Sequence, residues 1–325
     1  MTDRVMITGI GGMVGSHMTD HYAAAGVRPV GLYFNSTVRV GELRDRADLF
    51  ECDIRDPFRV LGLVDRFRPA VIHHLAAQSF PTVSWERPAE TLDINLTGTV
   101  NVCEAVKIVR QREPSYDPVV VVACSSAEYG ASLTPERTPI VEDAPLLPLH
   151  PYGVSKVGQD LLAFQYFRSD RIRTVRARIF NTTGPRKVGD ATSDFTRRAV
   201  EVEMGLQPSL RVGNLSTRRA ITDVRDLVRA LVLLSQSAEP GEVYNISGRH
   251  VYTMQEVVDT VVGQAKVPIA VVPDPSLLRP TDEPVIFGDS SRLTVRTGWE
   301  QRIPLKQTIG DMLEWWRDQL RRDNA

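Results

Sequence analysis

Tyr152 and Lys156 have the side-chain types and the spacing of a proton-transfer pair. On a helix, residues four apart leave the same face about one turn from each other. An ammonium beside a phenol favours the phenolate, so we expect Lys156 to lower the pKa of Tyr152 from its ordinary value of about 10. Such a tyrosine can pass a proton to or from a hydroxyl whose carbon is being oxidised or reduced. The spacing also occurs by chance on exposed helices, so other signals must support it.

A pair of serines follows an apolar run that is typical of a central strand. Residues 118–124 are continuously apolar, as expected of a parallel strand buried on both faces. Ser125 and Ser126 come at its C-terminal end, where ligands bind in open α/β sheets. We therefore expect Ser125 to act with Tyr152 on the reacting oxygen and Ser126 to face the substrate. The alternative is a serine that only satisfies strand-end backbone groups.

A glycine-rich turn lies near the N-terminus, between a short apolar strand at residues 4–8 and a helix at residues 13–25. Strand, glycine turn and helix are the context that a dinucleotide fingerprint requires. Gly9 permits the tight turn, Gly12 lets the backbone approach a pyrophosphate, and Gly15 lets helix and strand pack closely. The helix N-terminus offers free N–H groups to that anion. The alternative is a glycine turn without a ligand.

The ends of the next strands complete the expected cofactor site. The strand at residues 27–33 ends without an acidic residue, so the choice between NAD and NADP stays open, and Arg39 is either a 2′-phosphate contact or a solvated loop residue. A further strand leads to Asp53, near the adenine edge, while Asp56 suits a helix N-cap. The expected cofactor-binding residues are Gly9, Gly12, Met13, Val14, Gly15, Asp53, Ile54, Leu75, Ala76, Ala77, Tyr152 and Lys156.

The histidines do not indicate a metal site. His73 and His74 are adjacent on a predicted strand, residues 70–75, so they should point to opposite faces. The other histidines show no ligand spacing, and we expect no metal. In a predicted long helix, residues 89–110, Asn95 is either a contact beneath the active site or an ordinary surface residue.

Composition excludes several classes of partner. Lys and Arg total 39 and Asp and Glu 40, a formal net charge of -1, which gives no electrostatic reason to expect nucleic acid or an anionic membrane. Cys52, Cys103 and Cys124 share no close spacing and suit reduced packing residues. No apolar run approaches the roughly eighteen residues of a membrane span. With no signal-peptide pattern, we expect a soluble, cytoplasmic protein.

The order of elements predicts an α/β fold, a Rossmann doubly wound parallel sheet with a smaller α/β C-terminal substrate domain. Pro151 suits the first turn of the helix that carries Tyr152. Later strands and helices alternate to the end of the chain, without repeats or a low-complexity linker. We expect a dinucleotide-binding domain at residues 1–180, with residues 220–250 returning to it, and a substrate domain at residues 181–219 and 251–325.

Three motifs in this order resemble the extended short-chain dehydrogenase/reductase family of nucleotide-sugar enzymes: Gly9-x-x-Gly12-x-x-Gly15, Ser125 and Tyr152-x-x-x-Lys156. The resemblance covers nearly the whole chain. It implies a Rossmann domain that binds NAD or NADP and a smaller domain that binds a nucleoside-diphosphate sugar. It also implies a homodimer, formed through the two long helices at about residues 89–110 and 151–168.

Within that family the chain is most similar to the GDP-sugar branch of GDP-mannose 4,6-dehydratase and GDP-6-deoxy-mannose reductase. The residues that carry this likeness are Pro151 to Lys156, Arg178 to Asn181 with Gly184-Pro185, Val212 to Leu215, and Thr222 to Asp226. The resemblance implies that Asn181, Arg219 and Arg279 face the diphosphate, and guanidinium groups suit phosphate oxygens.

Departures from the family pattern bear on the reaction. Dehydratases of the family carry an acidic residue two places after the catalytic Ser or Thr, where this chain has Ala127, and Glu128 should point to the other side. We therefore disfavour 4,6-dehydration. Family members read Arg-Asp-Phe or Arg-Asp-Trp where this chain has residues 219–221, so the placement of the sugar is open.

A 4-epimerase with bound NAD and an NAD(P)H-dependent C4 reductase of a 4-keto-6-deoxy sugar need the same catalytic residues. Small side chains at Ser126 and Ala127 leave room for a rotating ketose, and no clear 2′-phosphate clamp is visible. On these grounds we favour the epimerase and keep the reductase as the alternative. A non-catalytic dinucleotide-binding protein is a last hypothesis, since a Rossmann fold does not prove catalysis.

Overall fold

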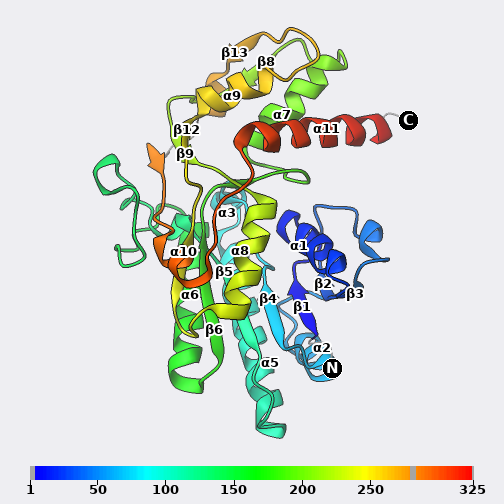
Figure 1. Ribbon diagram of the computed structural model, residues 1–325, viewed down its shortest axis with the longest axis vertical. Coiled ribbons are helices and arrows are strands. Elements are labelled where there is room, and N and C mark those ends of the chain that lie inside the picture. The colour runs from blue at the N-terminus through cyan, green and yellow to red at the C-terminus, as the bar shows by residue number, and fades with distance from the viewer. Residues whose placement is uncertain (1–3, 279–282, 324–325) are drawn as a thin grey trace.

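A seven-stranded parallel sheet forms the centre of the molecule (Figure 1), a computed structural model that describes residues 4–278 and 283–323. The strand order is β11-β6-β5-β4-β1-β2-β3. Its strands are β1 Val5–Thr8, β2 Val30–Tyr33, β3 Asp48–Glu51, β4 Val71–His74, β5 Val119–Ser125, β6 Arg173–Ile179 and β11 Val243–Ile246. The order reverses beside β1, so the predicted doubly wound Rossmann sheet is confirmed.

Helices cover both faces of this sheet. The helices α1 Met13–Ala24 and α8 Val224–Ser237 pack together on one face, and α2 Pro57–Phe67, α5 Gly98–Arg112 and α6 Pro151–Asp170 pack together on the other. The side chains of His73 and His74, adjacent on β4, lie on opposite faces of the sheet. His73 contacts Tyr22 of α1 (Nε2 to hydroxyl, 2.8 Å), whereas His74 contacts Thr99 of α5 (Nε2 to Oγ1, 3.1 Å). The prediction that they point apart is confirmed.

The predicted long helix at residues 89–110 is interrupted. Two short helices, α3 Pro81–Glu86 and α4 Pro88–Leu92, each begin at a proline, which is favoured at the first helical position. A π-helical turn, η2 Asp93–Thr97, then connects α4 to α5. Single π turns inside helices are frequent at functional sites. The apolar periodicity extends across the whole segment, so it did not reveal this turn.

A second layer lies over the carboxyl end of the sheet (Figure 1). Its helices, α7 Ala191–Glu203, α9 Met254–Val262 and α11 Leu305–Asp323, share a core with strand β8. Met312, Leu313 and Trp316 of α11 are buried in that core, as the sequence predicted. The short strands of this layer are β7 Thr182–Thr183, β8 Leu210–Val212, β9 Arg218–Ala220, β10 Thr222–Asp223, β12 Val251–Thr253, β13 Val271–Pro273 and β14 Val285–Ile286.

The helix α10 Ser291–Thr297 departs from the predicted division of the chain. It contacts α8 and β11 of the main sheet, and Leu293 and Trp299 are buried in the sheet's core. The stretch predicted as substrate domain therefore sends one helix back to the sheet. Short 3-10 turns complete the chain: η1 Val40–Leu43, η3 Ser126–Glu128, η4 Pro135–Arg137 and η5 Pro275–Leu277.

Two expectations from composition can be compared with the structure. The three cysteines are free and buried, as predicted. Within the described ranges we find no helix whose length and apolar character would suit a membrane crossing.

Candidate active site

The predicted site residues lie where the strands of the sheet end. Strands β1, β4 and β5 are neighbours and parallel, so their carboxyl ends share one edge. Gly9 follows β1 with φ +73, and a Cβ atom there would lie 2.8 Å from the backbone nitrogen of Ala76, after β4. The glycine turn and the turn at residues 75–77 are therefore in contact, and Ser125 ends the adjacent strand.

The glycine turn fits a dinucleotide. A Cβ atom on Gly15 would lie 2.4 Å from the Gly9 carbonyl oxygen, so only glycine allows this approach of helix and strand. Gly12 is the N-cap of α1 without a side-chain cap, and the first turn holds no acidic residue. The N–H groups of that turn therefore remain available to an anion. The backbone N–H groups of Thr37 and Val38 donate to the Gly11 carbonyl, which draws the loop after β2 against the turn.

Asp53 and Ile54 lie after β3 in different environments. The Asp53 carboxylate accepts hydrogen bonds from the backbone and side chain of Arg55, and that guanidinium lowers the pKa of Asp53. Ile54 is buried against Gly98 of α5. Their role as adenine contacts stays a prediction. Asp56 caps α2 by accepting from the N–H groups of the second and third helical residues, as expected.

Lys156 is buried on α6 and points to the strand that ends in Ser125. Its side chain is 3% exposed, and its Nζ donates to the Ala123 carbonyl at 2.8 Å. Burial disfavours the charged form and lowers the pKa of Lys156 to about 8. Lys156 is thus held in one position, close to losing its proton in mildly alkaline solution.

Tyr152 corrects the expectation from its spacing with Lys156. Burial of the phenol raises the pKa of Tyr152 to about 12, although a hydrogen bond with the Ser125 side chain acts in the opposite direction. The prediction that Lys156 lowers this pKa below its ordinary value is wrong for this structure. The Lys156 Nζ is 5.7 Å from the centre of the Tyr152 ring and is bonded to a backbone carbonyl, and desolvation is the largest cause of the shift. Tyr152 is therefore a phenol, a proton donor, at neutral pH.

Ser125 is fixed by a small turn that the sequence did not predict. Its backbone N–H donates to Glu128 Oε1 at 2.7 Å, and its Oγ accepts from the Ala127 N–H at 3.2 Å. These two bonds form a capping box on the 3-10 turn η3. The Oγ accepts there, so its proton stays available for an oxygen beside Tyr152.

Glu128 is turned into the protein interior. Its Oε2 lies 3.1 Å from Arg178 Nε, which also donates to Asp160 Oδ2 at 2.9 Å. Burial, followed by the nearby Asp160 charge, raises the pKa of Glu128 well above its ordinary range. This placement agrees with the expectation that Glu128 does not face the substrate. In the described part of the chain, Cys124, Glu128 and Asp160 have ligand atoms within 4.8 Å of one another, but the Arg178 guanidinium already holds both carboxyl groups.

Asn95 belongs to the site rather than to the surface. It is buried in the π turn η2, where its Nδ2 donates to Ser155 Oγ at 2.8 Å and to the Gln78 carbonyl at 3.1 Å. Its Oδ1 accepts from the Gln78 N–H at 2.8 Å. Asn95 therefore ties α6 to the turn after β4. In the sequence, Asn95 stands out as an amide on an otherwise apolar helix face. Its burial excludes the alternative of an ordinary surface residue.

The predicted diphosphate contacts are less organised. Asn181 follows β6, and its Oδ1 is buried without a hydrogen-bond partner among the described residues. The Thr222 hydroxyl is also buried without a hydrogen-bond partner among the described residues. The backbone N–H of Thr222 donates to the Asn181 carbonyl. Arg219 is 8% exposed and donates to the Glu283 carbonyl. Ser126 begins η3 and is buried beside Ser125. Arg279 lies outside the described residues.

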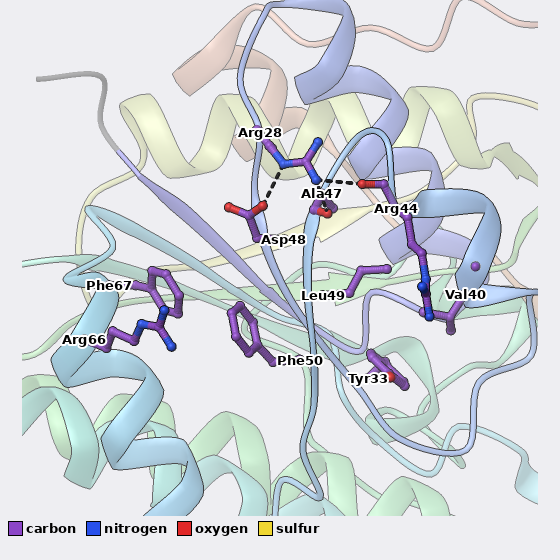
Figure 2. Close-up of a pocket in the computed structure, with 11 residues that line it drawn as sticks. Arg28, Tyr33, Val40, Arg44, Ala47, Asp48, Leu49, Phe50, Arg66 and Phe67 are labelled. Carbon is purple, nitrogen blue, oxygen red and sulfur yellow. Dashed lines mark hydrogen bonds and ion pairs between the residues drawn. The ribbon is translucent and has the colours of Figure 1, made fainter.

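A separate hollow of about 630 Å³ lies at the edge strand β3 (Figure 2). Phe50, Phe67 and Arg66 line one part of it, and Arg28, paired with Asp48, lines another. None of the predicted catalytic residues lines it. It is therefore distinct from the edge that holds Ser125 and Tyr152.

The sheet, the glycine turn and the Ser-Tyr-Lys set define an NAD(P)-dependent enzyme of the extended short-chain dehydrogenase/reductase class. The family model described as GDP-mannose 4,6 dehydratase matches residues 6–312, and the chain belongs to that family.

Relatives and solved structures agree with this assignment. The chain is 30% identical to a GDP-6-deoxy-D-mannose reductase from Pseudomonas aeruginosa, over 99% of this chain and all of the relative. Its structure is similar to that of RMD from Pseudomonas aeruginosa complexed with NADPH, with a TM-score of 0.83, 27% identity and coverage of 98% and 100%. It also resembles the Thermus thermophilus UDP-glucose 4-epimerase complex with NAD, with a TM-score of 0.85, 26% identity and coverage of 97% and 99%.

Proposed function

We propose that the protein is an NAD(P)H-dependent reductase of the C4 carbonyl of a GDP-linked 4-keto-6-deoxyhexose. The observation that carries this proposal is the end-to-end match to a curated GDP-6-deoxy-D-mannose reductase at 30% identity. The sequence alone left this reductase as the alternative to a 4-epimerase, which the small side chains at Ser126 and Ala127 suggested. The similarity to the reductase from Pseudomonas aeruginosa favours reduction.

The geometry supports reduction. NAD(P)H, when bound, supplies the hydride for C4. Tyr152, protonated with a pKa of about 12, donates the proton to the C4 oxygen. Ser125, whose hydroxyl proton is not needed for its cap, donates a hydrogen bond to the same oxygen. Lys156, anchored on the Ala123 carbonyl, holds its positive charge beneath the phenol. Each residue thus stabilises the oxygen as it gains electron density.

The nucleotide is proposed from the relatives and from charge. The GDP-sugar names of the relatives suggest a GDP-linked substrate. Asn181, Arg219 and Arg279 are proposed to bind its diphosphate, because amide and guanidinium donors match phosphate oxygens. The Asn181 Oδ1, which has no partner among the residues that the structure describes, supports a ligand at this point, since a side-chain amide can rotate to present its NH₂ group.

Two other reactions fit the site less well. Dehydration needs an acid two places after Ser125, and that residue is Ala127. The 4-epimerase is the second candidate, because Ser126 and Ala127 are small and a 4-epimerase shares the fold at 26% identity. A 4-epimerase needs Tyr152 to accept a proton in one half-reaction and to donate it in the other, whereas a reductase needs only the donor, which is the form that the raised pKa of Tyr152 favours.

The experiment compares two assays of the purified protein. With GDP-4-keto-6-deoxymannose and NADPH or NADH, we expect oxidation of the reduced nicotinamide and one equivalent of GDP-6-deoxyhexose. With a GDP-hexose and no added cofactor, we expect no change of sugar. A C4 epimer formed in the second assay, without nicotinamide oxidation in the first, would refute the reductase and support the epimerase. The Tyr152→Phe variant, inactive with retained cofactor binding, would argue against a non-catalytic binding protein.

A homodimer and a cytoplasmic location are proposed alongside the activity. On α6, Val154, Leu161 and Phe164 are 48%, 53% and 40% exposed at positions that share one helical face. An apolar face of this kind suits a helix packed against a second copy. Light scattering should give twice the chain mass, and Leu161→Glu should halve it. Cell fractionation tests the location.

A further inference from the structure

His150 is the N-cap of α6, the helix that carries Tyr152, and its side chain accepts a hydrogen bond from the backbone of the first turn. Its backbone is extended, with φ -153 and ψ 161, and its carbonyl accepts the first helical hydrogen bond, from the Val154 N–H at 3.1 Å. Its Nδ1 accepts from the Gly153 N–H at 3.0 Å. Serine, threonine, aspartate and asparagine are the usual residues at such a position, so an imidazole in this role is a particular feature of this chain.

The capped turn lies against the turn that holds Ser125. A Cβ atom on Gly153 would lie 2.7 Å from the Ala127 carbonyl oxygen and 2.9 Å from Pro148 Cβ. Ala127 in turn donates its N–H to Ser125 Oγ. The position of Gly153 therefore relates Tyr152, one residue before it, to Ser125. The hydrogen bond from the Gly153 N–H to His150 Nδ1 also holds Gly153 in this position.

The His150 ring also contacts the catalytic ring directly. The two ring centres are 5.9 Å apart and the planes are inclined by 15°, an offset stack. Cap and stack involve the same imidazole, so movement of His150 would move both the helix start and the phenol. Titratable groups on the two elements in this contact include Lys156 on α6 and Glu128 on η3, which are held by the Ala123 carbonyl and by Arg178.

An imidazole nitrogen accepts a hydrogen bond only when it carries no proton. Nδ1 is the acceptor here, so the capping form is the neutral ring with its proton on Nε2. Protonation places a hydrogen on Nδ1 facing the Gly153 N–H, and the cap is lost. Imidazoles ordinarily titrate near pH 6.5, within the range in which enzymes are assayed.

We propose that His150 is a positioning residue for Tyr152: its neutral imidazole caps the first turn of α6 and holds the phenol against Ser125, and protonation of the ring releases that turn. The proposal rests on the proposed function only for its activity assay. An acid loss of activity would not come from Tyr152 itself, because its phenol, with a pKa of about 12, is already protonated in acid.

Two variants of His150 separate the effect of its capping hydrogen bond from the effect of its ring stacking on Tyr152. His150→Asn keeps an acceptor for the Gly153 N–H but cannot be protonated in this range, and His150→Phe keeps a stacked ring without an acceptor. We expect His150→Phe to lower kcat about tenfold with little change in KM, as for the loss of a helix cap beside a reacting group. We expect His150→Asn to keep the kcat of the natural protein at neutral pH and to remove the fall of kcat in acid.

Hydrogen exchange of the peptide spanning residues 150–156 gives a readout without substrate. In the natural protein, the amides should be protected at neutral pH, and in acid they should exchange faster than in His150→Asn at the same pH. Full kcat in His150→Phe, an acid fall retained in His150→Asn, or equal losses in both variants would overturn the proposal. Absence of turnover in all forms would refute the proposed function alone, and the exchange experiment would still decide the role of His150.

Discussion

The two halves of the site differ in how completely their polar atoms are bonded. In the proposed catalytic edge, defined as Ser125, Tyr152 and Lys156, hydrogen bonds hold Ser125 through Glu128 and Ala127 and Lys156 through Ala123, and the Tyr152 phenol is hydrogen-bonded with the Ser125 side chain. In the proposed diphosphate half, defined as Asn181, Arg219 and the neighbouring Thr222, two buried oxygens, Asn181 Oδ1 and Thr222 Oγ1, have no hydrogen-bond partner among the described residues.

This contrast separates chemistry from binding. A preorganised edge stabilises charge that develops during the reaction without having to rearrange. Unpartnered buried atoms cost free energy that a ligand can recover. Substitutions in the catalytic edge should therefore lower kcat, whereas substitutions in the diphosphate half should raise KM.

Tyr152→Phe should have the largest effect. The ring and its packing remain, but the proton donor is lost, so we expect kcat to fall about 10³-fold. Binding of NADPH, followed by the change in nicotinamide fluorescence, should be within about twofold of the natural protein, since the glycine turn is untouched. A variant with more than a tenth of the natural kcat would contradict the assignment of Tyr152 as donor.

Ser125→Ala should come next. It removes a hydrogen bond to the reacting oxygen and leaves the Ser125 N–H bond to Glu128 intact, so we expect kcat to fall about 10²-fold with KM nearly unchanged. Ser126→Ala is the matched control on the neighbouring residue, which is proposed only to line the substrate. Equal losses in both variants would mean that the turn, not the Ser125 hydroxyl, is what matters.

Asn181→Asp tests the other half. A carboxylate at the proposed diphosphate position would repel that group, so we expect KM for the GDP-sugar to rise at least about tenfold, with kcat within about threefold. Asn181→Ala removes the amide without adding charge and should raise KM less. If kcat fell and KM did not change, Asn181 would belong with the catalytic edge, and the contrast between the halves would fail.

The pH dependence should give the smallest change over the usual range. Burial lowers the pKa of Lys156 to about 8, so its charge is present below that pH and lost above it. Loss of a positive charge beneath the phenol removes stabilisation of the developing phenolate, and kcat/KM for reduction should fall as pH rises through about 8. A rate that rises over the same range would indicate the oxidative chemistry of the epimerase.

Local patterns predicted much of the fold. The glycine turn, the apolar run before Ser125 and the alternation of strands and helices predicted a doubly wound sheet, and that sheet is present. These features depend on neighbours in the chain, because glycine spacing and apolar periodicity are short-range properties. The helix start at Pro88 agrees with the sequence, but the short helix α3 before it and the π turn η2 within it were not predicted, because a π turn does not break the apolar spacing of the helix.

The sequence by itself determined the class of chemistry: a phenol, an ammonium and a serine that must meet at the end of parallel strands. Only the tertiary structure decided how they are tuned. Burial, which no spacing reveals, raises the pKa of Tyr152 above that of a free phenol. Packing likewise turns Glu128 inward to Arg178 and seats Gly153 between His150 and Ala127. The physical reason is that desolvation and close contact depend on distant segments, whereas spacing along a helix does not.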